Sequence, residues 1–375
     1  MNIAYITNAR MPTEKANGYQ IAKMCEAFSN FGLDVTLVVP KRKNAIFSSL
    51  FDYYSIKQNF QVRSLPLFDW LTLDKALGRV AFYLLSFSFL LRVHKQIVPI
   101  GSIVYSRTLE VAWLFSRKGY KTFFECHQMP NKKSRLFSFF IKPVTGIIAI
   151  TQGLKSDLVE KYGYPSKKIL VAPDGVDLET FNILITREEA RKKLDLPMDK
   201  KIVLYTGHLY KWKGVDTLAQ AVTSLPLDTL VYMVGGTEEE IKLFKQRNFD
   251  TSRIINVAAR PREEIAVWLK AADVLILPNS GKEAISEKYT SPLKLFEYMA
   301  SGTPIVASDL PSIREIIGPE DAEFFIADNP ADLARAIRSL LADVDQAKLK
   351  AEKAYALGKN FSWINRAKNI LVFLA

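Results

Sequence analysis

The chain has 375 residues, 49% of them hydrophobic and 24% charged, which excludes a disordered or fibrous protein and predicts more than one globular domain. With 51 Lys and Arg against 39 Asp and Glu, its formal net charge of +12 suits an anionic membrane surface or an acidic substrate, and equally a solvated surface without a partner. No zinc-ligand spacing, nucleic-acid-binding aromatic strand or long basic run accompanies this charge, so we expect no nucleic-acid partner.

The first half of the chain predicts repeated strand–helix units. Residues 3–6 form an apolar run typical of a buried strand, and a loop carrying Pro12 and Gly18 follows. A helix with one apolar face comes next and stops at Gly32, and residues 35–39 form a second buried strand. Continuous apolar strands joined by helices indicate a parallel sheet that is covered on both faces. Further strands are expected at residues 103–105, 122–125, 147–150 and 169–172.

The pattern restarts after a polar stretch at residues 186–201. A strand at 202–205 leads to a helix that begins near Gly214, and Asn329 followed by Pro330 predicts the start of another helix. Further strands are expected at residues 230–234, 254–257, 274–277 and 304–307. The sequence therefore predicts an α/β protein with two doubly wound units and a boundary near residue 190.

The strongest motif is TSPLKLFEYMASG, which begins at Thr290. Thr290 or Ser291 is suited to cap a short helix with Pro292 in its first turn and Gly302 at its end. Unpaired amides at such an N-terminus form an anion site suited to a diphosphate, and Glu297 further along is suited to accept hydrogen bonds from a ribose. The alternative is an ordinary capped helix with a surface carboxylate.

This motif resembles the donor site of the retaining glycosyltransferases of family 4, which have the GT-B fold. In that family two glutamates are separated by seven residues, and the second, which matches Glu297, holds the nucleotide ribose. Tyr289 occupies the position of the first glutamate, which usually contacts the donor sugar. Lys294 is suited to add positive charge at the diphosphate or to bind an acidic donor sugar, the alternative being a solvated helix face.

Three other segments fit the same resemblance. Gly207-His208-Leu209, followed by Lys213, resembles the basic pair that braces the departing diphosphate, although arginine is commoner at the position of His208. His127 follows a buried strand, where sites lie, and the family carries a histidine there that contacts the donor sugar; a lone histidine is otherwise more often structural. Gly18 matches a loop whose amides approach the diphosphate.

The resemblance implies catalytic roles for three residues and donor contacts for eight more. The catalytic residues are His127, Lys213 and His208, and the donor and nucleotide contacts are Gly18, Tyr289, Ser291, Pro292, Leu293, Lys294, Glu297 and, by position alone, Arg260. Since no acidic cluster is placed for a divalent cation, we expect no metal. The implied reaction transfers a sugar from a UDP- or GDP-sugar to a hydroxyl with retention of configuration.

The resemblance also implies the domain boundaries. Residues 361–363 resemble the start of the last helix, which in GT-B proteins returns to the first domain. We therefore predict a Rossmann-like first domain of residues 1–185, completed by 361–375, and a nucleotide-sugar-binding second domain of residues 186–360. A deep cleft is expected between the two.

An aromatic-rich segment at residues 82–91 lies between Arg79 and Arg92, and a basic cluster at residues 132–135 precedes further phenylalanines. Basic residues beside aromatic ones are typical of an interfacial segment on anionic lipid, and burial in the core is the alternative. Our hypothesis is a glycan or lipid-linked acceptor, reached by a protein that binds peripherally to the inner face of the cell membrane.

The compartment and two other functions complete the expectations. Residues 80–91, the longest uncharged apolar stretch, fall short of the roughly 20 residues of a spanning helix, and residues 1–12 lack a secretory leader. With Cys25 and Cys126 far apart, this predicts a cytoplasmic protein. A nucleotide-sugar 2-epimerase of the same fold and a non-catalytic membrane scaffold stay open, whereas the lack of a Gly-x-Gly-x-x-Gly motif disfavours an NAD(P) oxidoreductase.

Overall fold

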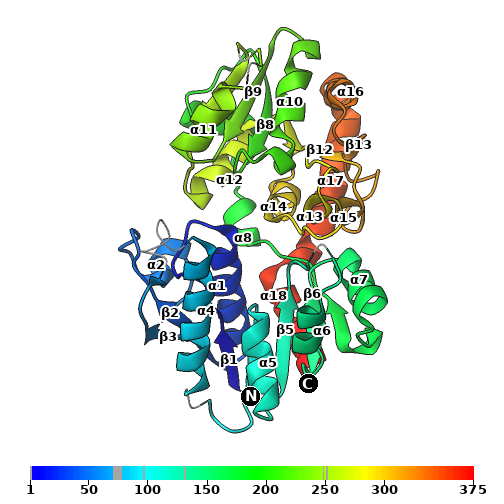
Figure 1. The fold of residues 1–375 in the computed structure, drawn as a ribbon. Coiled ribbons are helices and arrows are strands. Elements are labelled where there is room, and N and C mark those ends of the chain that lie inside the picture. The colour runs from blue at the N-terminus through cyan, green and yellow to red at the C-terminus, as the bar shows by residue number, and fades with distance from the viewer. Residues whose placement is uncertain (1, 71–77, 96–97, 131, 248, 251) are drawn as a thin grey trace. The chain divides into compact units, whose positions relative to one another are not determined.

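The computed structural model describes residues 2–70, 78–95, 98–130, 132–247, 249–250 and 252–375. The chain divides into two compact units (Figure 1). Unit 1 comprises Met1–Ile150, Leu154–Pro173 and Trp363–Ala375, and unit 2 comprises Thr151–Gly153 and Asp174–Ser362. Residues 174–185, expected in the first domain, pack with unit 2 instead, because Phe181 and Val176 lie in its hydrophobic core.

Unit 1 contains a seven-stranded sheet in the order β3-β2-β1-β4-β5-β6-β7, and all its paired strands are parallel (Figure 1). The strands are β1 (Asn2–Ile6), β2 (Asp34–Lys41), β3 (Gln61–Pro66), β4 (Ile103–Ser106), β5 (Thr122–Cys126), β6 (Gly146–Ala149) and β7 (Ile169–Val171). Six of the seven were predicted. The edge strand β3 was not, because only Leu65 among its residues is buried and no apolar run marks it.

The helices of unit 1 cover this sheet and include the C-terminal one. They are α1 (Ala16–Ser29), α2 (Leu50–Tyr54), α4 (Arg79–His94), α5 (Leu109–Arg117), α6 (Arg135–Ile141), α7 (Gln152–Tyr162) and α18 (Trp363–Leu374). The first residues of α7 belong to unit 2. Helix α18 packs on α1, where the rings of Tyr19 and Trp363 meet edge to face with centroids 6.1 Å apart.

Unit 2 contains a six-stranded parallel sheet in the order β10-β9-β8-β11-β12-β13. The strands are β8 (Lys201–Thr206), β9 (Thr229–Val234), β10 (Ile254–Val257), β11 (Val274–Leu277), β12 (Ile305–Ser308) and β13 (Glu323–Phe325). Ile202 and Leu204 enter one hydrophobic cluster, and Val203 and Tyr205 enter another. Both faces of the sheet are therefore buried, which is why its strands appear in the sequence as unbroken apolar runs.

The helices of unit 2 lie on both sides of this sheet. They are α8 (Leu178–Phe181), α9 (Arg187–Lys193), α10 (Val215–Ala221), α11 (Glu238–Lys245), α12 (Arg262–Ala271), α13 (Ala284–Glu287), α14 (Leu293–Ser301), α15 (Pro311–Arg314), α16 (Pro330–Ala342) and α17 (Val344–Gly358). The predicted start of α16 is confirmed, since the Asn329 side chain accepts a hydrogen bond from the Asp332 amide.

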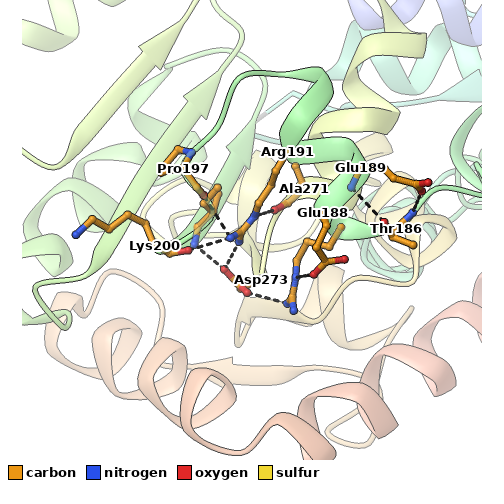
Figure 2. Close-up of polar contacts among 10 residues, drawn as sticks. Thr186, Glu188, Glu189, Arg191, Pro197, Lys200, Ala271 and Asp273 are labelled. Atoms are coloured by element: carbon orange, nitrogen blue, oxygen red, sulfur yellow. Dashed lines mark hydrogen bonds and ion pairs between the residues drawn. The ribbon is translucent and has the colours of Figure 1, made fainter.

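A buried ion pair holds helix α9 in unit 2, within the stretch that appears in the sequence only as polar (Figure 2). Helix α9 begins with a capping box formed by Thr186 and Glu189. Arg191 on this helix is 5% exposed, and its Nη2 lies 2.7 Å from Oδ2 of Asp273. Its other donors bond the carbonyl oxygens of Ala271 and Lys200, both at 3.0 Å. The buried guanidinium is therefore well satisfied.

Candidate functional site

Helix α14 carries the strongest sequence motif and is fixed at the end of the unit 2 sheet by Tyr298. The Tyr298 hydroxyl accepts a hydrogen bond from the Thr206 amide at 2.9 Å, which ties the helix to the carboxyl end of β8. Within α14 the apolar side chains of Leu295, Phe296 and Met299 are buried in the core. The N-terminus of the helix therefore has a defined place beside the strand ends, where sites occur in such sheets.

The start of α14 differs from the predicted capping. The cap residue is Pro292, whose side chain cannot accept a hydrogen bond, and the helix begins at Leu293. Ser291 does not cap the helix, because its hydroxyl accepts a hydrogen bond from the Asp174 amide at 2.8 Å. The amides of Leu293 and Lys294 belong to the first turn, in which the helix provides no acceptor for the amides. The expected anion-binding character of this terminus thus rests on backbone groups.

Lys294 lies inside the protein rather than on a solvated helix face, so that alternative is wrong. The residue is 7% exposed, and its ammonium has no hydrogen-bond partner among the described residues. The Nζ atom lies 3.8 Å from the centroid of the Tyr205 ring, and a Cβ at Gly207 would be only 3.3 Å from it. Burial and then the neighbouring Lys213 hold the pKa of Lys294 well below its usual value.

Lys213 brings a second ammonium to the same region. It ends the short helix η3 (Lys211–Lys213), and its Nζ lies 3.9 Å from the centroid of the Trp212 ring. Burial lowers its pKa to about 8. Gly214 comes next with φ of +74°, and a Cβ there would be 1.7 Å from the Pro278 carbonyl oxygen, so only glycine fits the turn. Among the described residues neither lysine has an ion-pair partner, and two partly desolvated lysines of this kind make a site for an anion.

Glu297 is held by Arg262, a residue that no sequence motif indicated. The Arg262 Nη1 atom lies 2.5 Å from Glu297 Oε1, and the Glu297 side chain is 12% exposed. Arg260, the expected base contact, instead pairs with Glu264 at 3.0 Å and is 40% exposed. Arg262 begins α12, and its partner lies 35 residues further along the chain, a separation that no local motif reveals.

The His208 ring contacts a carboxylate and an aromatic ring of unit 2, and Tyr289 is buried. The His208 ring stacks on Tyr210 with centroids 4.9 Å apart, and its Nδ1 lies 3.0 Å from Glu240 Oε1 on α11. The same carboxylate accepts a hydrogen bond from the Leu209 amide at 3.0 Å. Tyr289, at the position of the first motif glutamate, is 7% exposed. The imidazole of His208 is therefore engaged by Glu240.

In unit 1, His127 lies where the sequence predicted, directly after β5. Its Nε2 lies 2.5 Å from Glu125 Oε1. Gly18 was expected in the loop after β1, but it lies in the first turn of α1, where its amide donates to the Lys15 carbonyl oxygen at 3.1 Å. A Cβ at Gly18 would be 2.0 Å from the Tyr54 hydroxyl oxygen, so the glycine serves packing within unit 1.

The predicted residues thus form two groups. Lys213, Lys294 and Glu297, with the α14 amides, lie together in unit 2, and His127 lies in unit 1. The family description "Glycosyltransferase Family 4" matches residues 18–180, and "Glycosyl transferases group 1" matches residues 186–357. The chain belongs to glycosyltransferase family 4.

The chain is 29% identical over 238 residues to the D-inositol 3-phosphate glycosyltransferase of Xylanimonas cellulosilytica. The match covers 60% of this chain and 55% of the relative, so the chain spans about half the length of the curated relatives it matches. The structure of HepE from Anabaena in complex with UDP is 15% identical, covers 99% of both chains and has a TM-score of 0.76. WaaG, a glycosyltransferase involved in lipopolysaccharide biosynthesis, is 14% identical, with 98% of both chains covered and a TM-score of 0.68. The fold is therefore GT-B, as expected.

Helix α4 is apolar on two opposite faces. Ala81, Leu85, Phe89 and Val93 are buried, whereas Val80, Tyr83, Phe87 and Leu91 are each more than half exposed. The side chains of Arg79 and Phe82 lie outside the described set. Helix α5 packs between α4 and α6 (Figure 1), and α6 exposes Leu136 and Phe139 next to Lys132 and Lys133. None of the helices in the described ranges is both long and apolar enough to span a bilayer.

Proposed function

We propose that the chain transfers a sugar from a nucleoside diphosphate sugar to an acceptor hydroxyl, with the donor bound in unit 2. The observation that carries this proposal is the buried ammonium of Lys294, which has no hydrogen-bond partner among the described residues and lies at the start of α14. An ammonium in such surroundings is costly unless an anion joins it. The neighbouring Lys213 and the first-turn amides of α14 favour an anion of more than one charge, such as a diphosphate.

Glu297 provides the second donor contact. Arg262 holds its Oε1 atom, which orients the carboxylate and leaves Oε2 to accept hydrogen bonds from vicinal ribose hydroxyls. A diphosphate at the start of α14 and a ribose further along the same helix match the order of groups in a nucleoside diphosphate. The UDP in the HepE structure supports UDP as the nucleotide.

The reaction follows from where charge develops. The bond between the anomeric carbon and the diphosphate oxygen breaks, and a bond from that carbon to the acceptor oxygen forms. The two lysines and the amides stabilise the negative charge that appears on the departing diphosphate. In the retaining mechanism of the family, a leaving phosphate oxygen takes the proton of the acceptor hydroxyl on the same face, so the anomeric configuration is kept.

Nucleotide release from a panel of UDP-, GDP- and ADP-sugars tests the proposal, with and without a chelator and with bacterial membrane extract as acceptor. We expect release from a UDP- or GDP-sugar that depends on the extract and survives the chelator. Isomerisation of the sugar without an acceptor would indicate the epimerase instead. The absence of release with every donor would contradict the proposal.

We further propose a lipid-linked or surface-polysaccharide acceptor, reached by peripheral binding through α4 and α6. Tyr83 and Phe87 on α4 and Phe139 on α6 expose apolar side chains, and the exposed Lys132 and Lys133 come just before α6 in the chain. These observations support the proposal, because aromatic and basic groups together favour anionic lipid interfaces. The involvement of WaaG in lipopolysaccharide biosynthesis agrees with such an acceptor.

A flotation assay with vesicles of phosphatidylglycerol and phosphatidylcholine tests this surface. We expect binding that weakens as the salt concentration rises and as the proportion of anionic lipid falls, and that is reduced in a variant with Tyr83→Ser and Phe87→Ser. The matched control is Leu227→Ser, which removes an exposed apolar side chain from unit 2 and should leave flotation unchanged. Equal flotation of the double variant and the parent would remove α4 from the proposal.

A further inference from the structure

A buried polar cluster joins three separate segments of unit 1 behind His127. Glu125 on β5 is 1% exposed, and Arg366 on α18 is 4% exposed. Their side chains meet with Nη2 3.3 Å from Oε1 and Nη1 3.4 Å from Oε2. The Tyr105 hydroxyl on β4 donates to the same Oε2. Arg366 is itself fixed by the carbonyl oxygens of Pro173, 2.8 Å from Nε, and Ala172, 3.3 Å from Nη2.

The cluster keeps Glu125 ionised. Burial alone would raise its pKa, but Arg366, the hydrogen bond from His127 and the charge of Arg107 together hold the pKa well below its usual value. The tyrosine and cysteine side chains near it stay neutral, because burial raises the pKa of each: Tyr5, Cys25, Tyr105 and Cys126. Glu125 therefore acts as a fixed carboxylate that can only accept hydrogen bonds.

This carboxylate decides the state of the His127 ring. Burial and the charge of Arg107 lower the pKa of His127 to about 4, against the opposing effect of Glu125, so the ring is neutral near pH 7. A neutral imidazole carries one N–H. Because Nε2 lies 2.5 Å from an oxygen that only accepts, the hydrogen must be on Nε2. Nδ1 is then a hydrogen-bond acceptor.

We propose that Glu125, clamped by Arg366 and Tyr105, is a positioning residue that holds His127 as the Nε2–H tautomer, so that Nδ1 accepts a hydrogen bond from a hydroxyl of the sugar substrate. The inference deepens the proposed function and rests on it. His127 then recognises a neutral hydroxyl rather than balancing the charge of the diphosphate. The C-terminal helix α18 takes part in this site through Arg366, a residue that lies 241 positions beyond Glu125 in the chain.

The tautomer can be read without any substrate. The chain has only three histidines, His94, His127 and His208, so histidine labelled with nitrogen-15 gives a spectrum that one His127→Asn variant assigns. We expect the Nε2–H tautomer of His127 between pH 8 and about 5, without titration. An Nδ1–H tautomer, or a protonated ring at pH 7, would overturn the inference whether or not the protein transfers sugar.

The kinetic test asks whether Glu125 acts through His127. We expect Glu125→Gln to lower kcat by about 10- to 100-fold with the KM of the nucleotide sugar little changed. The reason is that His127 would no longer be held in the position from which it contacts the sugar. In a His127→Ala background the same substitution should cost almost nothing more. An equal loss in both backgrounds would overturn the inference.

Two further variants separate positioning from loss of fold. Asp273→Asn breaks the comparable buried pair with Arg191 in unit 2, so it should lower the melting temperature while the His127 spectrum keeps its tautomer. Glu125→Leu combined with Arg366→Met removes both charges together, which buried pairs tolerate better than the loss of one partner. We expect this variant to fold and to lose the fixed tautomer; an unchanged tautomer would count against the role of Glu125. If the parent transfers no sugar from any donor, the proposed function fails, and the spectrum still decides the tautomer.

Discussion

Replacing Lys294 with methionine should raise the stability of the ligand-free protein and weaken nucleotide binding. The substitution keeps a long, flexible side chain against Tyr205 and removes only the ammonium, which has no hydrogen-bond partner among the described residues. A buried polar group without a partner costs about 1–3 kcal/mol. We therefore expect the free energy of unfolding to rise by about 1–3 kcal/mol. For a unit of this size, each kcal/mol raises the melting temperature by about 2–4 °C.

The effect on binding has the opposite sign. A hydrogen bond to a charged group contributes about 1.5–3 kcal/mol, so the loss of the ammonium should weaken the binding of UDP by about 10- to 150-fold. General damage to the fold would lower both stability and affinity, whereas this substitution should change them in opposite directions. The two measurements together therefore distinguish a functional ammonium from a structural one.

Thermal unfolding without ligand and calorimetric titration with UDP measure the two effects. The control is Lys270→Met on α12, another lysine whose pKa is lowered by burial but which does not contribute to the proposed site. We expect the control to leave UDP affinity unchanged. A less stable Lys294→Met protein that binds UDP as tightly as the parent would refute the reasoning and leave the diphosphate without its proposed cation.

Three other predictions concern neighbouring groups. The affinity for UDP should fall as pH rises through about 8, because the diphosphate binds protonated Lys213, whose pKa burial lowers to about 8. Calorimetric titrations in buffers of different ionisation enthalpy should show proton uptake on binding, and a Lys213→Arg variant should flatten the dependence of UDP affinity on pH. Glu297→Ala should weaken UDP binding by about 1.5–3 kcal/mol, measured by calorimetry, whereas an unchanged affinity would place the ribose elsewhere. Gly18→Ala should lower the free energy of unfolding by about 1–3 kcal/mol, because the new Cβ would meet the Tyr54 hydroxyl. A smaller loss of unfolding free energy in a Tyr54→Phe background would confirm that contact.

Much of the fold could be predicted because both sheets are buried on both faces. Continuous apolar runs mark such strands, and the expected strands of both units are confirmed. The edge strands β3 and β13 were missed, because the side chains of β3 are exposed except for Leu65 and β13 has only three residues, so neither carries a long apolar run. The capping signal of Asn329 was correct, since a cap depends on residues that are close in sequence.

The site was less predictable for the same physical reason. The first-turn position of Lys294 was visible in the sequence, but its burial depends on Tyr205 and Gly207, which belong to a distant strand and loop. The pairing of Glu297 with Arg262 and the contact of Ser291 with Asp174 likewise join residues far apart in the chain. Motif spacing therefore does not reveal which of these residues contact one another.

The departure from the family motif at His208 is best understood together with the position of Lys294. The resemblance places a basic residue directly after Gly207, but the His208 ring is engaged by Glu240 and stacks on Tyr210. The ammonium that lies beside Gly207 comes instead from Lys294 on α14. The proposed diphosphate site requires positive charge at this position, and which side chain carries the charge matters less than where the charge lies. We therefore expect Lys294→Met to weaken UDP binding more than His208→Ala does, and the reverse order would assign the diphosphate contact to His208.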